Sequence, residues 1–82
     1  MTVYVDDKQI PYGRMKMCHV GADTREELLK MMKSLNIKPE HIQQEDTWRE
    51  HFDISQAKRA KAVKLGAVEV TSKQLINILR DK

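Results

Sequence analysis

Alternating and β-branched positions near the start of the chain predict two strands. Residues 2–5 form a short β-branched and aromatic run that two aspartates close, which is typical of a strand that delivers carboxylates at its end. A Pro-Tyr-Gly turn follows at residues 11–13, and residues 15–20 then read as a second strand. Because side chains alternate along a strand, His19 should lie on one face and Cys18 on the other.

The spacing of apolar residues then changes to that of helices. Asp23 and Thr24 each stand three residues before a glutamate, so either can form a capping box. Apolar residues recur at three- and four-residue spacings from Leu28 to Leu35, and Asn36 should end this helix. Pro39 suits the first position of one further short helix over residues 39–44.

The second half of the chain predicts a helix, a strand and a last helix. Ser55 can cap a helix that ends at Gly66, residues 67–71 read as a strand, and Ser72 can cap a helix. The apolar stripe of that last helix consists of Leu75, Ile76, Ile78 and Leu79. We expect the last strand to lie parallel to the first. The fold class is therefore α/β, a small three-stranded mixed sheet with three to four packed helices, in a single domain over residues 1–82.

Composition narrows the class of protein. Of the 82 residues 40% are hydrophobic and 33% charged, and no apolar window reaches the length of a membrane span. Cys18 is the single cysteine and no secretory signal precedes it, so we expect a cytoplasmic protein without disulfides. The net charge of +3 permits a nucleotide or nucleic-acid partner. A chain this short has a thin core, which also makes a homodimer a reasonable expectation.

One polar stretch stands out, from Trp48 to Ser55. His51 and Asp53 are two residues apart, so on an extended segment they point the same way and could share a metal ion. A phosphate could instead bind there, with Arg49 and Arg59 as its cationic partners. The alternative is local structure, in which Asp53 caps the following helix and His51 hydrogen-bonds the backbone.

Three earlier residues are further candidates. Asp6 and Asp7 follow a strand, where α/β folds often place ligand-binding carboxylates, although both could be solvated turn residues. His19 could be a half-buried histidine with a structural partner, and becomes a site candidate if it meets His51. Glycine-rich phosphate loops and paired-cysteine zinc motifs are absent from the sequence.

The arrangement of several segments is similar to that of a known family. These are Thr2-Val3-Tyr4-Val5-Asp6-Asp7, Cys18-His19, Trp48, His51-Phe52-Asp53-Ile54, Arg59, and Gly66-Ala67-Val68 followed by Val70-Thr71. With them the chain resembles, over nearly its whole length, the bacterial and phage family called domain of unknown function 4031. Family members usually carry serine where this chain has Cys18. The resemblance brings no activity, but its pattern falls on Asp6, His19, His51, Asp53 and Arg59 and so implies a shared site.

A looser likeness concerns the second half of the chain. Asp53-Ile54 with the later Gly66-Ala67 and Val70-Thr71, together with a first strand that ends in aspartate, resembles a fragment of the PIN-type nucleases. That likeness implies bound Mg²⁺ or Mn²⁺. The carboxylate expected after the Val-Thr pair is missing, because Ser72-Lys73 stands there.

Three functions follow as hypotheses. The first is a module whose pocket of Asp6, His19, Arg49, His51, Asp53 and Arg59 binds a phosphate-bearing ligand, either a nucleotide or a nucleic-acid end. The second is a metal-dependent phosphodiesterase or nuclease with Asp6, His51 and Asp53 at the metal. The third is a phage or accessory protein that binds a host protein through a methionine-rich face or the basic helix around Lys58 and Lys61.

Overall fold

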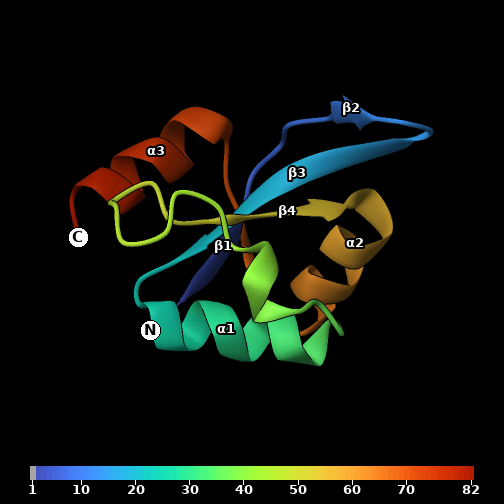
Figure 1. Cartoon of the computed structure of the whole chain (residues 1–82). Coiled ribbons are helices and arrows are strands. Elements are labelled where there is room, and N and C mark those ends of the chain that lie inside the picture. The colour runs from blue at the N-terminus through green and yellow to red at the C-terminus, as the bar shows by residue number, and fades with distance from the viewer. Residues whose placement is uncertain (1) are drawn as a thin grey trace.

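Strand β3 is the central strand of a mixed five-stranded sheet (Figure 1). The structure is a computed structural model that describes residues 2–82. The strands are β1 (Val3–Val5), β2 (Ile10–Tyr12), β3 (Met15–Ala22), β4 (Phe52–Ser55) and β5 (Val68–Glu69). Strand β3 pairs antiparallel with β1, β2 and β4, whereas β1 pairs parallel with β5. The α/β class and the parallel pairing of the first and last strands are confirmed.

The sheet has two more strands than the sequence predicted. Strand β2 contains Pro11, for which the sequence predicts a turn. At an edge of the sheet, proline is tolerated because its missing N–H is not needed there. Strand β4 covers the stretch that had been placed at the start of a helix. Its residues alternate strictly, with Phe52 and Ile54 buried and Asp53 and Ser55 half-buried. Four residues were too few for this alternation to be recognised.

Four helical segments connect and cover the strands. They are α1 (Arg25–Ser34), the 3₁₀ turn η1 (Pro39–His41), α2 (Gln56–Lys64) and α3 (Ser72–Arg80). The predicted helix over residues 39–44 is thus a single 3₁₀ turn. In the part of the chain that the structure describes, no helix combines the length and the apolar character needed to cross a membrane.

The helix caps follow the sequence closely. The Thr24 hydroxyl accepts a hydrogen bond from the N–H of Glu27, and Asn36 adopts the left-handed conformation (φ 59°) just beyond α1. Ser55 caps α2 by accepting from the N–H of Lys58, so Asp53 is not used as the cap. For α3 the expected cap is wrong by one residue, because Thr71 forms a reciprocal capping box with Gln74.

The two faces of the sheet have different partners. Helices α1 and α2 pack on one face, where Leu28, Met32 and Ala62 join the strand residues Val20 and Phe52 in the main core. Helix α3 crosses the other face (Figure 1). It packs closely because Gly21 has no side chain: a Cβ at that position would lie 2.9 Å from a Leu79 methyl. The second face is only partly covered, and the candidate site lies on it.

The methionines divide between the core and the surface. Met32 is buried and Met31 packs against the core, whereas Met15 is 49% exposed near the tip of the β2–β3 hairpin. Met15 therefore lies outside the core. Helix α3 shows a similar division, with Leu75 and Leu79 buried and Ile76 47% exposed.

Candidate functional site

Two neighbouring strands bring three ionisable side chains together on the face that α3 partly covers. His19 of β3 and Asp53 of β4 are directly opposite each other in the antiparallel ladder. His51 precedes Asp53 by two residues, and its backbone is paired with Gln43 through N–H···O distances of 2.8 and 3.1 Å. Because side chains alternate along a strand, His51 and Asp53 share the His19 face. The core residues Cys18, Phe52 and Ile54 point the other way.

The oxygen Asp53 Oδ1 faces one nitrogen of each histidine. It lies 3.7 Å from His19 Nε2 and 3.5 Å from His51 Nε2. The two imidazole rings meet edge to face, with centroids 5.1 Å apart. These N···O separations exceed those of normal hydrogen bonds, and Asp53 Oδ1 is buried without a hydrogen-bond partner among residues 2–82. Burying an oxygen without a hydrogen-bond partner normally destabilises the folded protein by about 1–3 kcal/mol, and by more if the group is charged. Asp53 Oδ1 is therefore the most unusual polar atom of the site.

The other nitrogen of each histidine is already engaged. His19 Nδ1 lies 2.6 Å from Asp6 Oδ2, and His51 Nδ1 lies 2.5 Å from the carbonyl oxygen of Arg49. A carbonyl oxygen only accepts, and so does an ionised carboxylate, so both Nδ1 atoms must donate. In the neutral imidazole this assignment leaves a lone pair on each Nε2. Both lone pairs are thus on the nitrogens nearest Asp53 Oδ1.

Asp6 is a fully buried carboxylate at the end of β1. Besides the His19 ring it accepts hydrogen bonds from the backbone N–H groups of His19 (2.9 Å) and Lys8 (3.2 Å). Burial by itself raises the pKa of Asp6, but the hydrogen bonds from His19 outweigh it and the net pKa is lowered. Asp6 is therefore ionised at neutral pH, and it holds the His19 ring in one orientation.

Asp53 and His51 influence each other's ionisation. His51, whose Nε2 lies 3.5 Å from Asp53 Oδ1, lowers the pKa of Asp53 despite the opposing effect of burial. The same carboxylate raises the pKa of His51, again against burial. The second oxygen, Asp53 Oδ2, accepts a 2.9 Å hydrogen bond from Gln43 Nε2. This contact fixes the carboxylate plane and leaves Oδ1 directed at the histidines.

A charged network holds the loop before β4 in place. Glu50 is 7% exposed, and its carboxylate accepts hydrogen bonds from the Arg25 guanidinium and from the backbone N–H of Asp46. Arg25 belongs to α1, so this network ties the loop to the opposite side of the sheet. Hydrogen bonding to Arg25 lowers the pKa of Glu50. Sequence reasoning missed Arg25, Glu50 and Gln43, because the pairs they form join positions distant in sequence.

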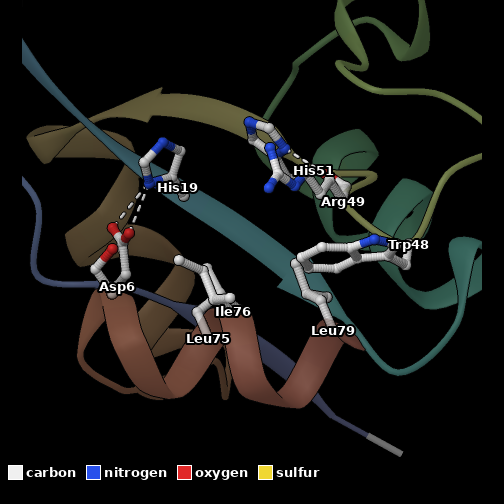
Figure 2. Close-up of a pocket in the computed structure, with 9 residues that line it drawn as sticks. Asp6, His19, Trp48, Arg49, His51, Leu75, Ile76 and Leu79 are labelled. Atoms are coloured by element: carbon white, nitrogen blue, oxygen red, sulfur yellow. Dashed lines mark hydrogen bonds and ion pairs between the residues drawn. The ribbon is translucent and has the colours of Figure 1, made fainter. Parts of the chain in front are cut away.

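A pocket of about 230 Å³ lies beside the histidines. Figure 2 shows Leu75, Ile76 and Leu79 of α3 on one side, the two histidines on the other, and Trp48 with Arg49 at one end. The Arg49 guanidinium lies over the Trp48 ring, 4.9 Å from its centroid. Asp6 and Ser72 complete the lining. The cluster is thus adjacent to a cavity that is mostly apolar and has one cationic side chain.

The residues singled out in the sequence therefore have different positions. Asp6, His19, His51 and Asp53 come together, and Arg49 lines the adjoining pocket. Arg59 is held elsewhere: its Nε donates to the Asp6 carbonyl oxygen and its Nη1 to Glu69, both at 2.9 Å. Asp6 uses its side chain to bind His19, so it lies behind the histidine rather than beside Asp53.

The fold and the site define a small α/β protein with a histidine and carboxylate cluster on one face of a mixed sheet. A family model described as "Protein of unknown function (DUF4031)" matches residues 3–82, and the chain belongs to this family. No curated protein and no solved structure matches the chain. The family resemblance is thus confirmed over essentially the whole chain, whereas the likeness to PIN-type nucleases gains no support from these comparisons.

Proposed function

We propose that the protein binds a divalent transition-metal ion through His19 Nε2, His51 Nε2 and Asp53 Oδ1, and uses it to hydrolyse a phosphate ester. The observation that carries the proposal is the buried, unpartnered Asp53 Oδ1 opposite two imidazole lone pairs. One candidate ligand atom from each of His19, His51 and Asp53 lies within 4.8 Å of those of the other two. Ligands at about 2.0–2.1 Å from a common ion are closer together than this, so small side-chain rotations would complete the site.

The surroundings of the ligands support a metal rather than a chance cluster. Metal-binding histidines usually donate their second N–H to a carboxylate or a backbone carbonyl, which sets the tautomer and the ring orientation. His19 has the carboxylate of Asp6, and His51 has the carbonyl oxygen of Arg49. In this proposal Asp6 is a positioning residue and His19 takes the place among the ligands that the sequence had suggested for Asp6.

The donor set indicates which ions fit. Two imidazoles and one carboxylate suit Zn²⁺, Mn²⁺, Fe²⁺ or Co²⁺ better than Ca²⁺ or Mg²⁺, which prefer oxygen ligands. Three protein ligands also leave coordination positions for water and substrate, as in catalytic zinc sites. The side chains of His19 and Asp53 are each 28% exposed, so solvent reaches the cluster.

The chemistry that such an ion supplies is hydrolysis. A bound divalent metal lowers the pKa of its water toward about 7 and polarises a phosphoryl oxygen. Held by His19, His51 and Asp53, the ion would supply hydrolysis of a phosphate ester, in which water replaces the alcohol on phosphorus and one water proton goes to the released alcohol. Arg49 lies next to His51 and can bind a non-reacting phosphate oxygen, which is the reason for proposing a phosphate substrate.

Hydrolysis of bis(4-nitrophenyl) phosphate with and without added Zn²⁺, Mn²⁺ or Co²⁺ tests this function. The proposal requires turnover that depends on metal, falls at least about 100-fold in Asp53→Asn, and is unchanged in His41→Ala. His41 is the matched control, because it is the chain's third histidine and is exposed outside the cluster. Metal binding without turnover of this ester would contradict the hydrolytic function.

A further inference from the structure

The pocket beside the cluster has an apolar body and one charged end. Its floor is the side of α3 formed by Leu75, Ile76 and Leu79, and the two histidines stand opposite (Figure 2). Trp48 is 40% exposed and Ile76 is 47% exposed, although both line this cavity. Large side chains at such positions gain from being covered by an apolar surface of a ligand.

The charged end of the pocket indicates which chemical groups a ligand should carry. The Arg49 guanidinium is held 4.9 Å from the centre of the Trp48 ring, which presents a cation and an aromatic surface side by side. A ligand that satisfies both would carry an anionic group next to a flat ring. The volume of about 230 Å³ is below the ~300–1,000 Å³ usual for pockets that bury drug-sized ligands, so a single ring system fits and a chain of them does not.

We propose that this pocket takes the base of a nucleoside phosphate, with its phosphate at Arg49 and the metal. The inference rests on the proposed function for the position of the phosphate, and it adds the class of substrate. Stacking on an aromatic ring tolerates every base, because each has a π-face. Ser72 is the one hydroxyl in the lining, so the structure predicts a nucleotide site with little discrimination among bases.

Ligands with and without a base test the inference. Adenosine 5′-monophosphate should bind at least about tenfold more tightly than ribose 5-phosphate, because only the former carries the base. Trp48 is the chain's single tryptophan, so stacking of the base should quench the protein's fluorescence. In Trp48→Ala, calorimetry should show that the advantage of the base is lost, so that the ratio of the affinities for adenosine 5′-monophosphate and ribose 5-phosphate falls to about one. Equal affinities for the two ligands in the wild-type protein would overturn the inference.

Two controls keep the result specific. Trp48→Phe retains an aromatic ring and should keep most of the preference, and Tyr12→Ala removes an aromatic side chain that is 68% exposed on the distant β2–β3 hairpin. Comparing adenosine monophosphate with an adenosine dinucleotide identifies the source of the ligand. Equal or tighter binding of the dinucleotide indicates the end of a strand, and weaker binding indicates a free nucleotide.

The two proposals can fail separately. Each titration is run on metal-free and on zinc-treated protein, since Trp48 does not depend on the ion. If the zinc-treated protein binds no zinc and still prefers the ligand with a base, the metal-dependent function is wrong and the pocket assignment stands. If the protein binds zinc but shows no preference for the ligand with a base, the pocket assignment is wrong and the metal site stands.

Discussion

Replacing Asp6 with asparagine probes the least accessible part of the site. The carboxylate is fully buried and accepts a short hydrogen bond of 2.6 Å from His19 Nδ1, and hydrogen bonds to an ionised acceptor are among the stronger ones. In Asp6→Asn, the side-chain amide can donate to that nitrogen. The imidazole proton would then move to Nε2 and occupy the lone pair that we assign to the metal.

The expected loss of metal affinity in Asp6→Asn follows from the position of Asp6, which hydrogen-bonds a metal ligand and does not contact the metal itself. Losing such an outer partner typically costs 10–100-fold in metal affinity, equivalent to about 1.4–2.7 kcal/mol. The carboxylate also accepts two backbone hydrogen bonds, so we expect a loss of about 1–3 kcal/mol in the free energy of unfolding as well.

Two measurements separate a positioning role from a purely structural one. Competition with a chelator gives the zinc affinity, and long-range proton–nitrogen NMR spectra report which His19 nitrogen carries the proton. Asp7→Asn is the matched control, because Asp7 is the adjacent aspartate, is exposed, and contacts the N–H of Ser72 instead. If Asp6→Asn keeps its proton on Nδ1 and binds zinc as the wild type does, the reasoning about the tautomer is refuted.

Three further predictions concern the framework around the site. The pKa of Glu50 is lowered by Arg25, so its contribution to stability is present above the ordinary glutamate pKa and disappears as the pH falls through the lowered value. Urea unfolding should therefore show Glu50→Gln less stable than wild type by about 1 kcal/mol at pH 7, a low figure because Arg25 is partly exposed. The difference should shrink as the pH falls below the ordinary glutamate range, and a difference that stays constant would contradict this. Gly21→Val should destabilise the fold by about 1–3 kcal/mol and loosen α3, because a Cβ there would already lie 2.9 Å from Leu79 and 3.1 Å from Leu75; unchanged stability would show that α3 does not pack as described. Burial raises the pKa of the Cys18 thiol to about 12, so iodoacetamide should modify the native protein far more slowly than the unfolded protein at pH 8, and equal rates would argue against the buried position of Cys18.

Much of the secondary structure could be predicted because its signals are local. The capping residues Thr24 and Ser55 act within three residues of themselves, and Asn36 ends α1 where the apolar stripe ends. Strand β4 was harder to recognise, since four residues of alternation look like a polar segment before a helix. Ser55 is correctly predicted as the cap of α2, but it is also the last residue of β4, so the residues before it were interpreted as the approach to a helix and not as a strand.

The residues of the cluster could be selected from the sequence, but their roles could not. The two-residue spacing of His51 and Asp53 predicts a shared face, and the family pattern adds Asp6 and His19. Nothing in the sequence shows that β3 and β4 are neighbours, and this pairing is what places His19 opposite Asp53. The direction of a side chain is likewise a tertiary property, so Asp6 was expected beside the metal and instead binds His19 from behind.

Arg59 illustrates the opposite outcome. Its place in a basic helix suggested a phosphate contact, yet its guanidinium is held by the Asp6 carbonyl oxygen and by Glu69, on a strand formed ten residues later in the chain. Arg49 had no stronger signal in the sequence, and it is the arginine that lines the pocket. Charge alone does not distinguish an arginine that holds two strands together from one that faces a cavity.

The most direct test of the metal site is a crystal of the protein grown with Zn²⁺, with diffraction data collected on both sides of the zinc absorption edge. We expect one anomalous peak within about 2.0–2.2 Å of His19 Nε2, His51 Nε2 and Asp53 Oδ1, with Asp6 still bound to His19 Nδ1. A peak at the exposed His41 alone, or no peak at the cluster in zinc-saturated crystals, would contradict it.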